Sequence, residues 1–452
     1  MPLPGYVRDA IQRLGESGHI AYVVGGSVRD FLVGRETKDH DLATDASPDE
    51  LCALFPEAVT VGKAFGVLKV PIRAAEGDPA GAKLPEFFEV ATFREDLEYE
   101  DHRHPTAVRF SGPEEDARRR DFTINALYYD AKTQKILDPT GGMADLERRV
   151  VRAIGEPDQR FKEDALRLLR AVRFTTALGF ELEARTAEAV KARARLIRHV
   201  SPERIRDELT LMLKGPRAAE SFELLRKLHL LEHVLPEVQA TAGLPQPGAA
   251  PSAGKDDVWL HTLRALRWLE RHCPARPAPL AWATLLHETG KPAAWQRNKK
   301  KNYNGHETEG ARVAGAVANR LKMPRQDCES ISAMVADHLK FKEVFEMRES
   351  TLVRFIRQPH FAELLELHRA DALATDGNLA FHDFCRSRLD AFQKGEGRDI
   401  PRLIDGTDLI QLGFKPGPEF SEILRIVEDL AIERRLVSKD QALEFVVQNF
   451  VR

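Results

Sequence analysis

A change in hydrophobic spacing near residue 145 is the feature that most restricts how this chain folds. Before it, short apolar runs such as 19–24 end at Gly or Pro and alternate with amphipathic segments, which predicts strands mixed with helices. After it, apolar residues recur three or four positions apart, as in 163–174 and 201–213, and this spacing continues almost throughout. The sequence therefore predicts an α+β fold, in which a mixed sheet with helices is followed by an all-α region.

Composition excludes several classes of protein. The 452 residues are 43% hydrophobic and 30% charged, a balance typical of globular domains and not of disordered or fibrous chains. The net charge is −3, so any contact with a nucleic acid has to come from local basic patches. No apolar run approaches the ~18 residues that a membrane span needs, so no membrane association is expected.

Cysteine usage and the first residues bear on the compartment. The four cysteines lie far apart and form no C-x-x-C pair, so neither a disulfide framework nor a zinc ribbon is expected. The chain does not open with a basic segment followed by an apolar one, the pattern of a secretory signal. Both observations predict a cytoplasmic protein, and nothing in the sequence indicates an obligate protein partner.

Two aspartates, Asp39 and Asp41, are candidate metal ligands. They lie two positions apart in a segment, 39–44, that is predicted to be a strand, so both side chains point to one face about 6–7 Å apart along it. Two carboxylates aimed at one space suit a pair of Mg²⁺ ions that clamp the oxygens of a phosphoryl transfer. The alternative is two solvated aspartates at the end of a strand.

The turn before this pair is a candidate phosphate site. Gly25 and Gly26 follow a predicted strand and open a predicted helix, where a backbone without side chains and free N–H groups can approach an anion. Ser27 adds a hydroxyl donor and Arg29 a guanidinium fork. A Gly-Gly turn is often only a turn, but beside the acidic pair it predicts a triphosphate cradle next to a metal site.

Both motifs resemble a known signature. GGSVRD followed by KDHDLAT is similar to the signature of the class II tRNA nucleotidyltransferases and bacterial poly(A) polymerases, which belong to the polymerase β-like nucleotidyltransferase superfamily. Further motifs of that family follow in order, namely ATFR (91–94), RRDFTINAL (119–127), DPTGGMADLERRVVRAIG (138–155), EDALRLLRAVRF (163–174) and SPERIRDEL (201–209). The resemblance implies transfer of a nucleoside monophosphate from a nucleoside triphosphate to an RNA 3′-hydroxyl, with release of pyrophosphate.

The resemblance also implies a domain order. A catalytic nucleotidyltransferase head is expected at 1–145 and a helical neck for nucleotide selection and RNA binding at 146–215. A helical body and tail are expected at 216–452, with an HD-like region at about 255–375. Segments 73–86 and 241–257 are rich in Ala, Gly and Pro and are predicted loops.

Site residues are carried over position by position. By resemblance, Asp39 and Asp41 hold two Mg²⁺ ions, and Glu89 on the strand before ATFR is a third carboxylate, unless it is simply an exposed strand residue. The expected nucleotide-binding residues are Gly26, Ser27, Arg29, Arg119, Asp121, Asn125, Asp164, Arg167 and Arg170. For Asp121 a structural role, as partner of Arg119 or Arg120, is an equal alternative.

Asp164 and Arg167 are candidates for base selection. At positions i and i+3 of one predicted helix they share a face, where the carboxylate accepts and the guanidinium donates. Cytosine and adenine each present an amino donor beside a ring-nitrogen acceptor, whereas uracil and guanine present the reverse order. Such a pair favours C and A, and in the resembling family it acts as the template, with Glu163 placed to orient Arg167. The alternative is an exposed salt bridge.

Two segments bear on the activity within the family. The residues at 61–66 resemble the tRNA nucleotidyltransferase form rather than the basic element of poly(A) polymerases. The polar stretch 93–110 resembles the flexible loop that CC-adding members lack. A CCA-adding or an A-adding enzyme that uses ATP, and CTP for full addition, is therefore expected, and a poly(A) polymerase is the alternative.

The predicted partner is tRNA, bound through its acceptor arm and 3′ end. Residues 191–217 contain eight basic and three acidic side chains, a net charge of +5 that forms a local basic patch. About half of these cations are expected to be ordinary solvated residues on helix faces.

The second half contains an imperfect metal motif. WLHTL, LLHETGKP, GHETEGA and RADALA resemble an HD domain, which holds a metal ion with two His and two Asp for phosphoester hydrolysis. The corresponding residues here are His261, His287, Glu288 and Asp371. Because glutamate moves its carboxylate by a bond length, we expect a degenerate HD domain that serves as a tRNA-binding body, with an active phosphohydrolase carrying an inactive head as the alternative. The other histidines, including His306 and His338, are expected to serve packing or to lie on the surface.

Overall fold

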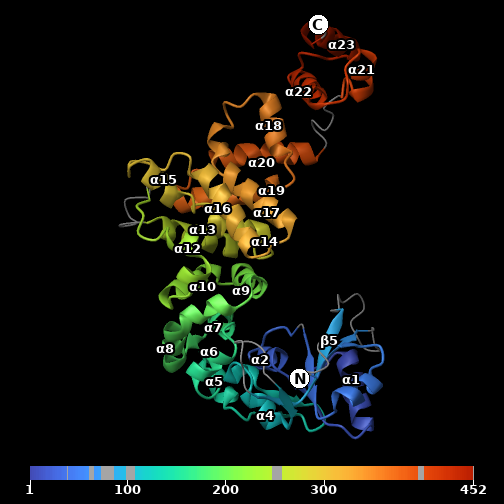
Figure 1. Cartoon of the computed structure of the whole chain (residues 1–452), viewed down its shortest axis with the longest axis vertical. Coiled ribbons are helices and arrows are strands. Elements are labelled where there is room, and N and C mark those ends of the chain that lie inside the picture. The colour runs from blue at the N-terminus through green and yellow to red at the C-terminus, as the bar shows by residue number, and fades with distance from the viewer. Residues whose placement is uncertain are drawn as a thin grey trace. The chain divides into compact units, whose positions relative to one another are not determined.

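The computed structural model describes residues 1–37, 39–60, 66–72, 86–97, 107–246, 257–394 and 402–450. They fall into two compact units, Met1–Pro236 and Glu237–Arg452. In Figure 1 the strand arrows occur in the blue-to-green part of the chain, and the described part coloured yellow to red is helical. The α+β fold predicted from the sequence is confirmed, and the predicted boundaries at 145 and 215 both lie inside the first unit.

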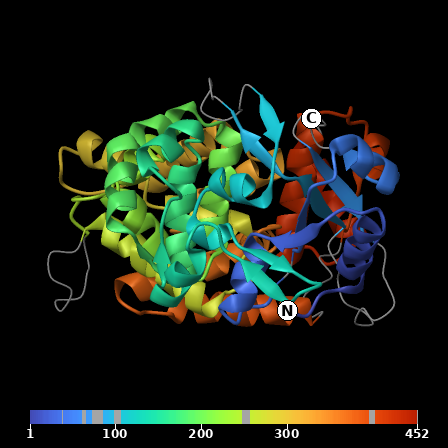
Figure 2. The ribbon, with the colours of Figure 1, turned by 90° about the horizontal axis from the view of Figure 1, so that it is seen from below.

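The first unit contains a seven-stranded mixed sheet. Its strands are β1 (Ala21–Val24), β2 (Asp41–Thr44), β3 (Val59–Thr60), β4 (Val67–Pro71), β5 (Phe87–Thr92), β8 (Tyr128–Asp130) and β9 (Lys135–Leu137). The strand order is β3-β4-β5-β2-β1-β8-β9, in which only β2 and β5 run parallel. The hairpin β8–β9, teal in Figure 2, extends the blue part of the sheet beyond β1.

Two smaller pairings accompany the main sheet. β6 (Arg94–Asp96) pairs with β7 (Val108–Phe110) in antiparallel register, and β10 (Val150–Val151) pairs with β11 (Glu181–Leu182) in parallel register. The first pair flanks the predicted flexible loop.

Helices surround the sheet and make up the rest of the first unit. They are α1 (Gly5–Glu16), α2 (Gly26–Leu32), α3 (Pro48–Leu54), α4 (Pro113–Arg118), α5 (Gly142–Arg148), α6 (Pro157–Glu163), α7 (Arg167–Leu178), α8 (Ala184–Arg193), α9 (Pro202–Lys214), α10 (Ala218–Lys227) and α11 (Leu231–Val234). α1 packs on the sheet, where the ring of Tyr6 lies 5.2 Å from that of Phe88 on β5. Short 3₁₀ helices, η2 (Thr123–Asn125) and η3 (Ala194–His199), connect other elements.

The second unit is helical in its described part. Its helices are α12 (Pro236–Gln239), which begins at the boundary, α13 (Val258–His272), α14 (Ala278–Leu286), α15 (Lys291–Arg297), α16 (His306–Arg320), α17 (Arg325–Asp337), α18 (Glu349–Ile356), α19 (Phe361–Thr375), α20 (Ala380–Gln393), α21 (Gly406–Gln411), α22 (Pro418–Ile432) and α23 (Lys439–Phe450). α14 is apolar on all sides and is buried from Leu280 to Leu286, which makes it the central helix of this unit. The polar residues that directly follow α14 are therefore also placed in the interior.

Candidate active site

The end of β1 sets the centre of the site. Val24 pairs with Asp41 in antiparallel register, so Asp41 lies beside the turn that follows Val24. Gly25 in this turn has a φ of 73°, a conformation that favours glycine, and α2 begins directly after it at Gly26. Strand pairing therefore brings the predicted phosphate turn and the acidic pair together, as the sequence suggested.

The acidic pair lies at the start of β2, and only Asp41 belongs to the strand. Asp41 is the first residue of the strand and Asp39 precedes it, which corrects the prediction of a strand over 39–44. Both residues nevertheless line one cavity of about 740 Å³. Burial and the charge of Glu89 raise the pKa of Asp41 to about 6. A carboxylate in that setting is stabilised by a divalent cation, so the residues present fit a metal site.

Glu89 has features of both roles considered for it. Because Leu42 on β2 pairs with Val90 on β5, Glu89 lies next to Asp41 across the sheet. Its side chain is about half exposed and lies 3.7 Å from Lys69 Nζ. The contact with Asp41 is consistent with a third carboxylate at the metal site, and this assignment stays a prediction.

The groups predicted to bind phosphate have partners within the fold. Ser27 Oγ donates to the carbonyl of Val24 at 3.2 Å. The buried Arg29 guanidinium donates to both carboxylate oxygens of Asp30, at 2.8 and 3.0 Å, and to Asn125 Oδ1 at 2.5 Å. These contacts hold Arg29 in a fixed orientation at the cavity wall, which the sequence did not show.

Asp116 on α4 is a buried anchor that the sequence reasoning missed. It accepts from Arg119 Nε at 2.8 Å, from Arg120 Nη2 at 3.1 Å and from the Tyr128 hydroxyl at 2.7 Å. Burial alone would raise the pKa of Asp116, but the two guanidinium groups lower it to about 2. Arg119 and Arg120 are thus paired with Asp116, which corrects the alternative in which Asp121 is their partner.

Asp121 pairs instead with Arg170 on α7. It accepts from Arg170 Nε at 2.7 Å and from Asn125 Nδ2 at 3.0 Å. Although Asp121 is buried, Arg170 and Asn125 lower its pKa to about 2. Because Asn125 also binds Arg29, four of the predicted nucleotide-binding residues form one hydrogen-bonded chain.

The segment around Asp164 differs from the prediction. EDALRLLRAVRF is not one helix, because α6 ends before Asp164, whose backbone is extended, and α7 begins at Arg167. The two residues therefore do not share a helix face. Arg167 instead donates to Glu163 Oε2 at 2.8 Å, a contact consistent with the orienting role of Glu163, which stays a prediction. Both Asp164 and Arg167 line the cavity.

Arg204 is a partner of Asp164 that sequence reasoning did not identify. Its two terminal nitrogens lie 3.2 and 2.8 Å from the two carboxylate oxygens of Asp164. Arg204 belongs to SPERIRDEL on α9, about forty residues further along the chain. In the sequence, Arg204 was only one cation of the predicted basic patch, because spacing does not reveal a contact between residues about forty positions apart.

The cavity is lined by charged residues of both signs. Besides Gly25, Gly26, Ser27, Asn125 and Phe174, its described lining consists of Asp30, Glu36, Asp39, Asp41, Asp121, Asp164, Arg29, Arg119, Arg120, Arg167, Arg170 and Arg173. The guanidinium groups of Arg29, Arg170 and Arg173 all lie near the ring of Phe174, and that of Arg173 is 4.2 Å from the ring centroid. Acidic and basic walls around one volume suit a ligand that carries both metal ions and phosphates.

Much of the charge in the predicted basic patch is neutralised locally. Five of the eight cations in 191–217 form ion pairs, and four of the acidic partners lie outside that segment; the pairs are Lys191–Glu188, Arg193–Asp158, Arg204–Asp164, Arg206–Asp207 and Arg217–Glu220. The net charge of +5 therefore overstates the field available to RNA, because the sequence count omits these partners.

Two segments used to distinguish family members lie largely outside the described residues. These are 61–65, in the element compared with poly(A) polymerases, and 98–106, in the predicted flexible loop. Of the predicted loops, 73–86 is described only at residue 86, and 241–257 only at 241–246 and 257.

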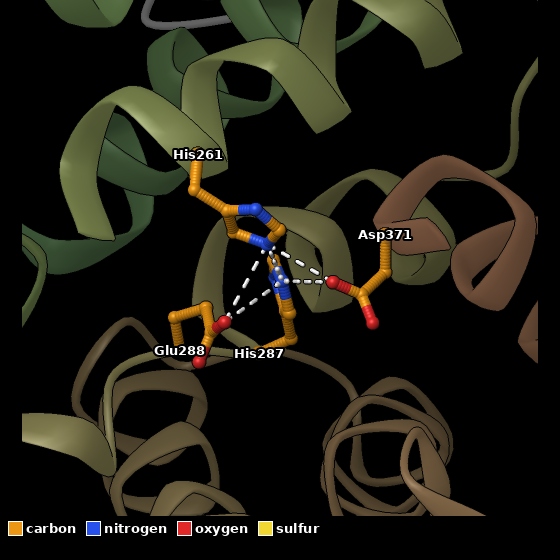
Figure 3. Close-up of side chains that lie close together, drawn as sticks. All are labelled: His261, His287, Glu288 and Asp371. Atoms are coloured by element: carbon orange, nitrogen blue, oxygen red, sulfur yellow. Dashed lines mark hydrogen bonds and ion pairs between the residues drawn. The ribbon is translucent and has the colours of Figure 1, made fainter. Parts of the chain in front are cut away.

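The HD-like residues of the second unit converge. His261 on α13, His287 and Glu288 after α14, and Asp371 on α19 place ligand atoms within 4.8 Å of one another, as Figure 3 shows. Glu288 Oε1 lies 3.4 Å from His261 Nε2, so the longer side chain does not leave the cluster, contrary to the reason given for a degenerate site. Lys291 Nζ contacts Glu288 Oε1 at 2.5 Å. Burial alone would raise the pKa of Glu288, but Lys291 and the neighbouring imidazoles lower it to about 2.

His306 and His338 also face this cluster. With Glu288 they form a second group of buried donors within 4.8 Å. The expectation that they serve only packing or lie on the surface is therefore corrected. The donor set of carboxylates and imidazoles fits a divalent ion.

Other general features are consistent with the composition. Within the described ranges, no helix has the length and apolar character needed to span a bilayer. The four cysteines are all free thiols.

Comparison with known proteins identifies three domain families. Residues 21–152 match the poly A polymerase head domain, residues 179–241 match the probable RNA and SrmB-binding site of polymerase A, and residues 258–376 match the HD domain. Each match covers less than half of the chain.

Relatives cover more of the chain. A CCA-adding enzyme of Lactobacillus helveticus is 41% identical over 440 residues, which are 96% of this chain and 94% of that protein. A CCA-adding enzyme of Geobacillus thermodenitrificans is 42% identical over 281 residues, and this alignment spans only 62% of either protein. The crystal structure of the Bacillus stearothermophilus CCA-adding enzyme in complex with CTP has a TM-score of 0.69 at 27% identity and covers 99% of this chain and 98% of that one. With nearly full-length identity above 40% and the same fold, the chain belongs to the family of the CCA-adding enzymes.

Proposed function

We propose that this protein adds nucleotides to the 3′ end of tRNA without a template, using CTP and ATP and releasing pyrophosphate. The observation that carries the proposal is the pairing of Val24 with Asp41, which joins the acidic pair to the glycine turn in one charged cavity. Relatives named CCA-adding enzymes and a similar structure holding CTP support the choice of substrates.

Asp39 and Asp41, with Glu89 beside them, are the residues that would hold two Mg²⁺ ions. When bound, the ions neutralise the triphosphate and favour attack by the RNA 3′-hydroxyl. The chain itself supplies position and charge: the N–H groups at the start of α2 face the phosphates, and Arg29 adds positive charge at the cavity wall.

Asp164 and Arg167 select the base in this proposal. The carboxylate accepts the amino group of cytosine or adenine, and the guanidinium donates to the neighbouring ring nitrogen. Uracil and guanine would leave these groups unpaired. Each unpaired group would weaken the binding free energy of the nucleotide by ~1–3 kcal/mol. Glu163 supports the choice because it holds Arg167 in place.

The partner is tRNA, bound through residues of the neck and second unit, and the protein acts in the cytoplasm. The match of 179–241 to an RNA-binding family supports the binding of tRNA. Four free thiols support a reducing compartment.

Incorporation of labelled nucleotide into tRNA tests the proposal. We expect Mg²⁺-dependent labelling from CTP and ATP that disappears in Asp39→Ala and Asp41→Ala. Lys132→Ala, at an exposed lysine in the turn between β8 and β9, is the matched control and retains activity. Full activity of Asp41→Ala would refute the metal assignment.

Two tRNA substrates distinguish the activities within the family. One lacks CCA and the other ends in CC, and each is supplied with both nucleotides. Extension of both means full CCA addition, and extension of only the second means an A-adding enzyme. Long adenylate tails on unstructured RNA would instead identify a poly(A) polymerase.

A second candidate function rests on the convergence of His261, His287, Glu288 and Asp371 in the second unit. A metal-dependent phosphohydrolase would use this cluster independently of the head. Hydrolysis of cyclic phosphate esters that survives Asp41→Ala and is lost in His287→Ala would establish it. If the full-length chain, supplied in excess together with divalent cations, hydrolyses none of these esters, this function is excluded.

A further inference from the structure

The outer face of α13 carries arginines and aromatic rings. The opposite face of this helix is buried in the core of the second unit. Six residues outside the core recur at helical spacing and fall on one stripe, namely Leu260, Arg264, Arg267, Trp268, Arg271 and His272. A solvated helix face needs only polar residues, so the rings among these arginines require a further explanation.

Trp268 and His272 form a stack at the C-terminal end of α13. Their ring centroids lie 4.6 Å apart, and the planes of the two rings differ by 12°. His272 Nδ1 lies 2.9 Å from the carbonyl oxygen of Trp268. Because a carbonyl only accepts, Nδ1 donates and fixes the imidazole over the indole. His272 is exposed, so the face of its ring that is turned away from Trp268 is available to another ring.

A cation from α19 supports this stack. The guanidinium carbon of Arg369 lies 5.1 Å from the centroid of the Trp268 ring, a distance at which cation and ring attract each other. α13 packs along α19, so the contact joins two helices of the core. The side chains of Arg267, Trp268, Arg271, His272 and Arg369 are called the α13 platform below. Its rings are held in place before any ligand binds.

The charge of the platform is positive. α13 contains three arginines and a single acidic residue, Glu270, whose charge acts on the buried Arg276. The acidic neighbour on α19, Glu366, accepts from Arg386. Arg271 is exposed and forms no ion pair with any described residue. Its guanidinium is therefore available to an anionic partner.

Rings beside arginines form the surface that unpaired nucleotides bind. Every base has a π-face that stacks on an aromatic ring, and guanidinium groups bind the phosphates next to that base. An acidic peptide would use the arginines but would leave the stacked rings without a role. RNA fits both parts of the platform.

We propose that the α13 platform binds RNA, with one unpaired base stacked on His272 and the adjacent phosphates at Arg267 and Arg271. The inference rests on the proposed function in one respect, because it takes tRNA as the RNA that binds there. The platform belongs to the second unit, whereas the catalytic cavity belongs to the first. Since the platform supplies binding and no reacting group, its loss should raise the KM for tRNA and leave kcat unchanged.

Binding of a tRNA transcript without CCA to the full-length protein tests the stack. Fluorescence anisotropy gives the dissociation constant, and labelled CTP and ATP give KM and kcat. We expect His272→Ala to weaken binding about 5- to 10-fold. His272→Phe keeps a ring at this position and should restore most of the affinity. Because His272 is exposed, both variants should fold, and thermal unfolding checks this.

Salt dependence tests the charged part of the platform. Arg271→Ala should weaken tRNA binding and lower the slope of log affinity against log salt concentration by about one, the value for one lost phosphate contact. Arg325→Ala removes an exposed arginine from α17 of the same unit and is the matched control, which should leave affinity and slope unchanged.

Two simple RNAs distinguish stacking from contacts with the backbone alone. A short oligouridylate should lose affinity in His272→Ala, whereas an RNA duplex without unpaired bases should bind this variant and the unsubstituted protein equally. Affinity for tRNA that is unchanged in both His272→Ala and Arg271→Ala would overturn the proposal, as would His272→Phe that binds as weakly as His272→Ala. A protein that binds tRNA through His272 but adds no nucleotide would retain the platform and refute the proposed function. Nucleotide addition that does not depend on His272 would do the reverse.

Discussion

Replacing Asp41 by Asn should make the protein more stable while removing its activity. Burial and the neighbouring Glu89 raise the pKa of Asp41 from 3.8 to about 6. The folded state therefore holds this proton more tightly than the unfolded state, so stability is lost as the pH rises through this interval. At one pKa unit per ~1.4 kcal/mol, ionised Asp41 costs the fold about 3 kcal/mol at pH 8. Asn removes the charge and keeps a similar shape.

The assay is urea unfolding in the presence of a chelator. We expect Asp41→Asn to raise the free energy of unfolding by about 2–3 kcal/mol at pH 8, and by about half that amount at pH 5, where many of the molecules with Asp41 retain the proton. Hydrogen exchange of the β1 and β2 amides assigns the gain to the first unit. Asp39→Asn, at an exposed position, is the matched control and should change the free energy by less than about 0.5 kcal/mol.

Magnesium supplies the second half of the test. Added Mg²⁺ should stabilise the unsubstituted protein and narrow its difference from Asp41→Asn, because the variant lacks a ligand. If Asp41→Asn were equally or less stable than the unsubstituted protein at pH 8 in chelator, the carboxylate would not be electrostatically strained. Asp41 would then need no cation to offset the cost of its burial.

Three further substitutions test residues that position a side chain of the site or stabilise one of the two units. Arg204→Ala should free Asp164 and raise misincorporation of UTP relative to CTP, with a larger change in KM than in kcat. Arg204→Lys should restore part of this selectivity. Equal selectivity in the unsubstituted protein and both variants would contradict the role of Arg204. Asp116→Asn should destabilise the first unit in urea by about 3–5 kcal/mol, because it leaves two arginines without their buried anion, and a change below about 1 kcal/mol would count against that anchor. Gly290→Ala should destabilise the second unit in thermal unfolding, since a Cβ there lies 2.0 Å from a backbone carbonyl. Gly315→Ala, whose Cβ meets only a serine hydroxyl at 3.0 Å, should have a much smaller effect.

Local sequence was sufficient to predict the element types. Short apolar runs that end at Gly or Pro, followed by apolar residues three or four positions apart, distinguished the sheet from the helical region, and glycines marked the turn at Gly25, where φ is 73°. The motifs then pointed to the acidic pair and to Asp164 and Arg167, all of which line the cavity. Local reasoning failed at Asp164, where α6 has ended, the backbone is extended, and the side chain pairs with the distant Arg204.

Contacts between distant segments were beyond the sequence. Asp116 and Arg204 are ordinary charged residues in helical patterns, and nothing in their spacing distinguishes them from solvated side chains. The sequence likewise did not show that Glu288 lies beside His306 and His338. The glutamate was compared only with the aspartate of the motif, and its neighbours in space were unknown. In the folded chain, neighbouring helices set where that carboxylate lies.

The sequence by itself determined the α+β order, the family and the residues that carry the proposed chemistry, since these follow from local spacing and from motifs of contiguous residues. Only the tertiary structure decided which charges are paired, how strongly the pKa of Asp41 is raised, and that a second set of ligands meets at Glu288. The physical reason is that pairing and burial depend on distance in space, which strand register and helix packing fix between residues that are far apart along the chain.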